Sequence, residues 1–254
     1  MAKHNCAICG AEVGLLSEQK LADGNYICRK ECSKKCFKIF DRVAASLGDV
    51  TSHIKQIEFG TKVWNQIFVP LQKTKNKEEK LRQIYGIKDG LMYVSPSTGL
   101  IALIENRYKF FIFGKTTYSC VYRVADLYGY EYDCETTKDA EGKVQKKHFC
   151  TFMFRNTSGL YAPRVEIGDA NDHSQIEKYF NELFGIQKTL RNSINNAKRQ
   201  ANAIKSAIGA VKDAVNGTLD EASAADAVDA IDASVYGDRT EWIKKADAAL
   251  ATVK

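Results

Sequence analysis

The cysteines near the start of the chain have the residue type and the spacing of a metal site. Five of the eight cysteines of this 254-residue protein lie within its first forty residues. Cys6 and Cys9 lie in a Cys-x-x-Cys-Gly turn. After a gap of eighteen residues, Cys28, Cys32 and Cys36 follow at spacings of four. Structural zinc sites hold the ion in a tetrahedron of four thiolate or imidazole ligands, and two cysteine pairs separated by a hairpin supply such ligands. This stretch therefore predicts a zinc site.

The expected ligands are Cys6, Cys9, Cys28 and Cys32. The second pair is one residue longer than the usual Cys-x-x-Cys, but a spacing of four still places both sulfurs on one face of a helix. Cys36 is also four residues from Cys32, so it is an alternative ligand in place of Cys28 or Cys32, and His4 is a weaker substitute. Disulfides, free thiols, an iron centre or a redox pair are other uses of the same cysteines.

The compartment of the protein bears on the choice between metal and disulfides. Lys3 and His4 interrupt any apolar run before Cys6, so we expect no secretory signal peptide. A chain without that signal stays in a reducing compartment, where closely spaced cysteines point to metal. No apolar run reaches the length of a membrane span. We therefore expect a cytoplasmic protein with Zn²⁺ as its cofactor.

The residues around the cysteines predict how the two pairs meet. Asp23-Gly24 is a turn signal between apolar residues, and the strand after it leads into Cys28. From Phe37 to Leu47 the apolar residues fall at helical spacing, which predicts an amphipathic helix that begins near the second pair and contains Cys36. A strand that ends and a helix that begins at one ligand pair is typical of treble-clef zinc folds. So small a unit buries too little apolar surface to fold alone, so we expect the metal to act as its core.

The head of the chain contains the motifs Cys6-x-x-Cys9-Gly10, Val13-Gly14-Leu15-Leu16, Lys20-Leu21-x-Asp23-Gly24 and Tyr26-Ile27-Cys28. In these motifs it resembles a bacterial family, the domain of unknown function numbered 4428. The likeness covers about residues 4–45 and is weaker over 85–185. It implies an N-terminal zinc-ribbon-like unit followed by a β-rich domain similar to pleckstrin-homology folds. It implies no activity.

Helices, a linker and then strands are expected after the head. Gly48-Asp49 predicts a helix break, followed by a helix that ends near Pro70. Residues 72–82 are polar and basic, which predicts a linker or an exposed helix and a domain boundary near residue 80. Between residues 83 and 168, short β-branched and aromatic runs separated by turn signals predict an antiparallel sandwich or barrel. A helix from about Asn171 is expected to close a pleckstrin-like barrel, with Asp172 as its N-cap.

The remaining residues predict a helical tail. The apolar stripe of the closing helix is Ile176, Phe180, Leu183 and Phe184. Beyond it, residues 190–215 repeat apolar residues at spacings of three and four, as in a coiled-coil-like seam. Helices at 218–235 and 238–253 are expected to fold back along that seam or to pair between chains. The expected fold class is α+β, with a zinc head at 1–47, a helix and linker at 48–82, a β-domain at 83–185 and the tail at 186–254.

Signs of catalysis are few. The sequence has no phosphate-binding loop, no dinucleotide-binding glycine motif and no His-Glu-x-x-His. Cys134, His148 and Cys150 lie on neighbouring predicted strands and, with Cys120, are a candidate second metal site. Buried cysteines in strands more often only pack as small apolar residues. We therefore expect no enzymatic activity.

Charge and aromatic content define the expected partners. The net charge is +6, but residues 206–254 carry −4, so the preceding 205 residues carry +10. A basic body with an acidic tail is compatible with nucleic acid or anionic lipid, and equally with ordinary solubility. The aromatics between Tyr108 and Tyr132 are a candidate base-stacking surface, although core packing explains them better. We expect a zinc-containing binding protein that contacts a protein partner or itself through the tail, with nucleic-acid or lipid binding as alternatives.

Overall fold

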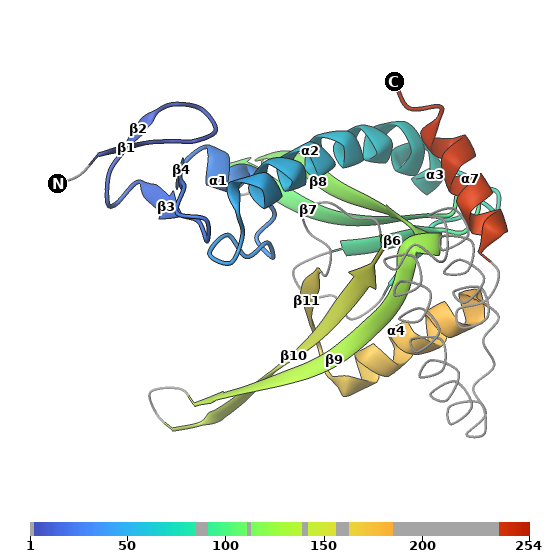
Figure 1. Ribbon diagram of the computed structural model, residues 1–254. Helices are drawn as coiled ribbons and strands as arrows, with labels where there is room; N and C mark the ends of the chain where they lie inside the picture. Colours follow the sequence, from blue (N-terminus) through green and yellow to red (C-terminus); the bar gives the residue numbers. More distant parts are fainter. Residues whose placement is uncertain (1–2, 85–90, 111–112, 139–141, 156–162, 185–238) are drawn as a thin grey trace, which may run out of the picture. The chain divides into compact units, whose positions relative to one another are not determined.

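The computed structural model describes residues 3–84, 91–110, 113–138, 142–155, 163–184 and 239–254. Its helices and antiparallel sheets give a mixed α+β fold (Figure 1). The chain divides into two compact units, one formed by Met1–His173 with Trp242–Lys254 and the other by Ser174–Glu241. The domain boundaries expected from the sequence stay predictions.

The head consists of two small hairpins and a single helical turn. Strands β1 (His4–Asn5) and β2 (Glu12–Val13) pair antiparallel, as do β3 (Glu18–Lys20) and β4 (Tyr26–Cys28). The predicted turn joins β3 to β4, where Gly24 adopts a positive φ of 84° that favours glycine. Asp23 accepts a hydrogen bond from the Asn25 backbone N–H within this turn. Helix α1 (Cys32–Lys35) follows β4.

The prediction of an amphipathic helix from Phe37 to Leu47 is wrong. Helix α1 ends at Lys35, and residues 36–46 form turns and irregular backbone. The Arg42 guanidinium supplies hydrogen-bond donors for the carbonyl groups of this region. It donates to the carbonyls of Ser33, Cys36, Phe37 and Phe40. Phe37 and Phe40 belong to this irregular segment, and both side chains are buried. Their spacing of three matches that of a helix, and periodicity alone does not distinguish a helix from an irregular segment with buried side chains.

The long helix begins earlier than expected. Helix α2 (Leu47–Val63) starts at a capping box, in which Ser46 and Asp49 each accept from the other's backbone N–H. Gly48-Asp49 thus lies in the first turn of a helix and does not break one. The helix continues through a π-helical segment (Trp64–Phe68) into α3 (Val69–Gln72), past Pro70. The wider π turn accommodates a proline that would otherwise clash with the preceding turn.

Beyond the head, the strands that the structure describes form two sheets. The first has the order β5-β6-β7-β8, with β5 (Arg82–Gln83), β6 (Leu91–Ser95), β7 (Leu100–Phe110) and β8 (Phe113–Arg123). A 3-10 turn (Val124–Asp126) leads into the second, whose order is β11-β10-β9, with β9 (Leu127–Lys138), β10 (Val144–Phe154) and β11 (Arg164–Ile167). The rings of Tyr122 and Phe154 stack at 4.1 Å between the two sheets. Among the described residues the sheets do not join into a closed barrel.

Helix α2 lies against the first sheet (Figure 1). Gly60 makes this possible, because a Cβ on Gly60 would lie 2.2 Å from the Ser119 carbonyl oxygen of β8. A buried cluster then joins the α2–α3 region to the sheet through side chains that include Trp64, Phe68, Leu100 and Ala102.

Helix α7 (Thr240–Leu250) is present, as expected for the last helix, while the seam along which it was expected to fold lies outside the described residues. Ala246 is fully buried in the cluster of Trp64 and Phe68, and Leu250 packs against the same cluster. Arg123 pairs with Asp247 at 2.7 Å, and the Gln66 side chain bonds both the backbone N–H and the carbonyl of Lys254. This helix therefore belongs to the core of the first unit.

Helix α4 (Ala170–Leu183) buries Ile176 and Phe180, as its predicted stripe requires. Its N-terminal cap is Asp169, whose carboxylate accepts hydrogen bonds from the N–H groups of Asn171 and Asp172. The prediction that Asp172 is the N-cap is therefore wrong. Asp172 instead reaches back to the Gly168 N–H. The seam at 190–215 and the helix at 218–235 lie outside the described residues. In the described part of the chain, no helix has the length and apolar character needed to cross a membrane.

Candidate metal centre

Four cysteine sulfurs converge in the head. The Sγ atoms of Cys6, Cys9, Cys28 and Cys32 all lie within 4.8 Å of one another. Cys6 and Cys32 are separated by 3.7 Å between sulfurs, and Cys9 and Cys28 by 3.8 Å. A tetrahedral zinc site with Zn–S bonds of about 2.3 Å has sulfurs about 3.8 Å apart, so this spacing fits the ion. The structure brings together the four cysteines that the sequence pattern singled out.

Local backbone geometry positions each sulfur. Gly10 has a φ of 75°, and its N–H donates to the Cys6 carbonyl, so the first pair lies on one tight turn. The Cys28 N–H donates to the Cys6 sulfur at 3.3 Å, and the Cys32 N–H donates to the Cys28 sulfur at 3.2 Å. Hydrogen bonds to sulfur stabilise a thiolate, so at Cys6 the backbone favours the form that binds metal.

The pKa values of Cys6 and Cys32 are shifted in opposite directions. Burial raises the pKa of Cys6, but the N–H groups of Cys9, Cys28 and Ile8 outweigh burial and lower that pKa to about 6. Burial, together with hydrogen bonds from neighbouring cysteines, moves the pKa of Cys32 strongly upward. Four thiols so close together cannot all lose their protons unless a cation offsets the repulsion between the resulting thiolates. A divalent ion reverses this effect by stabilising every thiolate that it contacts, so the donor set requires a cation to be fully charged.

The alternative ligands lie elsewhere. Cys36 is buried outside the group of four, and burial raises its pKa to about 11. His4 stacks on Tyr26 at 3.8 Å between ring centroids, and its Nδ1 lies 2.8 Å from a Glu18 carboxylate oxygen. Neither residue belongs to the sulfur cluster.

The candidate second site does not form as a metal site in the described residues. Cys134 lies directly opposite His148 in the β9–β10 ladder, but the His148 Nδ1 is hydrogen bonded to the Tyr132 hydroxyl at 2.7 Å. Cys150 is fully buried in β10, and Cys120 is fully buried in β8. Over these residues, the head cysteines are the only group with metal-site geometry.

Sequence reasoning missed an ionic contact that fixes the head to the first sheet. The Glu105 carboxylate on β7 accepts from the Lys38 N–H at 2.7 Å and from the Arg107 Nε at 2.6 Å. The remaining guanidinium nitrogens of Arg107 donate to the carbonyls of Lys34 and Cys36. The available signal was Glu105, directly after the apolar run Leu100–Ile104, with Arg107 two residues further on, because charges next to a buried strand need partners.

His53 on α2 holds the irregular segment in the same region. It is fully buried, stacks on Phe40 at 4.4 Å and accepts a hydrogen bond from the Phe37 N–H through Nε2. Burial lowers its pKa to about 4, so the ring is neutral and able to accept this bond. The cluster that contains Cys6, Cys28 and Cys32 is continuous with this packing around Phe40.

Comparison with known proteins gives a domain but no activity. Residues 4–56 match the family model described as Domain of unknown function (DUF4428). No curated protein and no solved structure matches the chain. The matched segment contains all four clustered cysteines and the buried His53, while Glu105 and Arg107 lie beyond it.

Proposed function

We propose that this protein is a non-enzymatic, zinc-containing binding protein that acts through contact with a protein partner or with itself. The observation that carries the proposal is the four-cysteine cluster. Cysteines would fill all four tetrahedral positions of the zinc, and a site filled in this way is structural, because catalytic zinc keeps one position open for water or substrate. The metal would then fold the head, and function would lie in the surfaces that the head helps to build.

The β-domain is proposed to be pleckstrin-like. The order of elements supports this: four strands in one sheet, three strands in the next, and then helix α4. Pleckstrin-like folds serve as recognition platforms, although fold alone does not name a ligand. We propose that the protein works in the cytoplasm and that the seam at 190–215 is a second contact surface.

Metal analysis and partner analysis of the full chain test this proposal. Protein purified under reducing conditions should carry about one zinc per chain, measured by elemental mass spectrometry. Light scattering and nuclease-treated affinity capture should reveal either self-association or a stoichiometric protein partner. Capture that depends on nucleic acid would favour the nucleic-acid alternative, and a metal-free folded head would refute the zinc assignment.

A further inference from the structure

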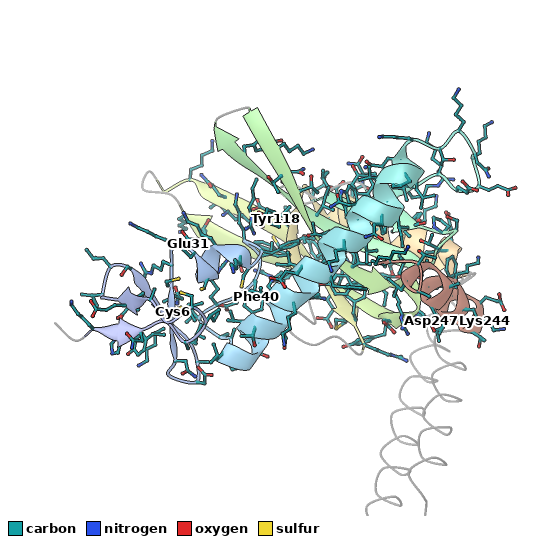
Figure 2. All side chains as sticks on the ribbon, turned by 90° about the horizontal axis from the view of Figure 1, so that it is seen from above. Cys6, Glu31, Phe40, Tyr118, Lys244 and Asp247 are labelled. Carbon is teal, nitrogen blue, oxygen red and sulfur yellow. The ribbon has the colours of Figure 1, made fainter. Side chains whose placement is uncertain are left out.

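A groove lies beside the metal centre, where the head, α2 and the first sheet meet. All of its lining residues belong to the first compact unit, and its volume is about 660 Å³. One wall comes from the residues around α1, the floor from α2, and the opposite wall from Arg107 and Tyr118. Figure 2 shows Glu31 and Tyr118, which belong to these two walls, on the same side of α2. The volume is in the range of about 300–1,000 Å³ that is typical of ligand pockets.

The rim of the groove is basic. Four exposed lysines line it, Lys30, Lys34, Lys35 and Lys62, against two carboxylates, Glu31 and Glu58. None of the four lysine ammonium groups makes an ion pair with any residue that the structure describes. The charge of Arg107 is already compensated by Glu105. The free positive charge is therefore carried by the lysines.

The floor of the groove is apolar and fixed. Ile57 is buried and Ile54 is half-buried, and both project from α2. The Tyr118 ring is covered by the Arg107 guanidinium at 4.5 Å, and Arg107 in turn holds the Lys34 and Cys36 carbonyls. Because these contacts fix the wall in place, the groove is largely preformed, which reduces the cost of ordering on binding.

The chemistry of the lining distinguishes between anionic ligands. A bound phosphate requires convergent donors, and Arg107, the guanidinium in the groove, already donates to Glu105, Lys34 and Cys36. Lysines distributed along a rim instead match several carboxylates spaced along a chain, and an apolar floor matches an aliphatic side chain between them. We propose that this groove binds an acidic peptide segment of a protein partner, with an apolar residue against Ile54, Ile57 and Tyr118. This inference rests on the proposed function, because it names the surface and the partner chemistry for that binding role.

Peptide binding to the zinc-loaded full chain tests the groove. The probe is a fluorescein-labelled peptide of about twelve residues in which leucines alternate with pairs of Glu or Asp. Fluorescence anisotropy should show binding that weakens with added salt. A peptide with serine in place of leucine should bind at least about tenfold more weakly, because it lacks the apolar contact. A lysine version of the probe should not bind.

Matched variants locate the site. K34E/K35E should weaken probe binding by about tenfold or more, whereas K77E/K80E, with the same charge change in the exposed 72–82 segment, should change it by less than about twofold. The α2 variant K62E should weaken binding without altering α1. Equal weakening by K34E/K35E and K77E/K80E, or equal affinity for the serine peptide, would show diffuse attraction and overturn the proposal.

Two further outcomes separate this inference from the proposed function. Binding of phosphatidylserine vesicles or single-stranded RNA through the same lysines, with no binding of the peptide, would overturn the acidic-peptide assignment. If a captured protein partner remains bound to K34E/K35E as tightly as to the unaltered chain, the binding function stands and the groove is not its surface.

Discussion

At the scale of single residues, the sulfur cluster separates cysteines that look alike in sequence. Cys32 and Cys36 are each four residues from a neighbouring cysteine, yet only Cys32 lies in the group of four. The difference arises because α1 ends at Lys35, so Cys36 leaves the helix with an extended backbone conformation. Its carbonyl is then held by Arg42 and Arg107.

Replacing one cysteine of the group of four, and separately Cys36, tests which cysteines are ligands. Cys9→Ala should lower zinc affinity by about a hundredfold or more, because a structural site loses one of its four ligands. Cys36→Ala should retain about one zinc per chain. Competition with a chromogenic chelator measures both affinities. Equal zinc loss in the two variants would mean that Cys36 is a ligand.

His53 predicts how stability depends on pH. Its pKa is lowered from 6.5 to about 4 by burial, so the unfolded chain binds more protons than the folded chain between these values. The neutral ring therefore contributes stability that is fully present above about pH 6.5 and is lost as the pH falls toward about 4. Between about pH 7 and about pH 5.5 the free energy of unfolding should fall by about 1 kcal/mol from this residue.

Urea unfolding of the zinc-saturated protein measures this effect, with His53→Gln as the matched variant. The glutamine side chain does not titrate, so the variant should show a flatter pH dependence over the same interval, whatever its stability at pH 7. Identical slopes for the two proteins would contradict a buried neutral His53.

At the scale of elements, one close approach decides how α2 meets the sheet. A Cβ on Gly60 would lie 2.2 Å from the Ser119 carbonyl oxygen and 3.0 Å from the Val121 nitrogen. Both obstacles are backbone atoms of β8, so no side-chain rotation relieves the clash. The helix and the strand therefore require glycine at this position.

Gly60→Ala should destabilise the protein by about 3 kcal/mol, because the helix must move away from β8. Gly48→Ala in the same helix is the control, because its added Cβ would meet only the Ser46 hydroxyl at 3.6 Å. That substitution should leave stability unchanged or raise it by about 0.5 kcal/mol, since alanine favours a helix over glycine. Thermal unfolding followed by circular dichroism compares the two, and equal effects would refute the close approach.

At the scale of the whole molecule, the head with its four clustered cysteines and the first sheet belong to one compact unit. Glu105 and Arg107 join them, because these two β7 residues hold the backbone of Lys34, Cys36 and Lys38. Glu105 is only 8% exposed, so its carboxylate depends on these partners.

A double-mutant cycle measures the Glu105–Arg107 ion pair on which this connection depends. Arg107→Gln alone should cost about 3 kcal/mol, because it leaves the Glu105 carboxylate buried without its cation. Arg107→Gln combined with Glu105→Gln should cost less than the sum of the two single changes, with a coupling of about 2 kcal/mol. Chemical unfolding of the three variants gives the coupling, and additive effects would show that Arg107 does not compensate the Glu105 carboxylate.

The local features of this protein can be predicted from its amino-acid sequence. The cysteine spacing, the Asp23-Gly24 turn, the zinc-compatible ligand set and the alternation of strands all depend on residues near one another in the chain. Short-range geometry restricts such features strongly, so spacing and turn residues predict them. The α+β class follows from the same signals.

Features that join distant residues depend on contacts that the sequence pattern does not specify. Burial of Phe37 and Phe40 against His53 replaced an expected helix with turns, and Arg42 satisfied the backbone that the helix would have satisfied. Helix α7 packs with Trp64, more than 170 residues away in sequence, in the cluster that also contains Phe68. An apolar stripe shows that a surface must be buried, but not which surface covers it, because that choice depends on packing and charge across the whole chain.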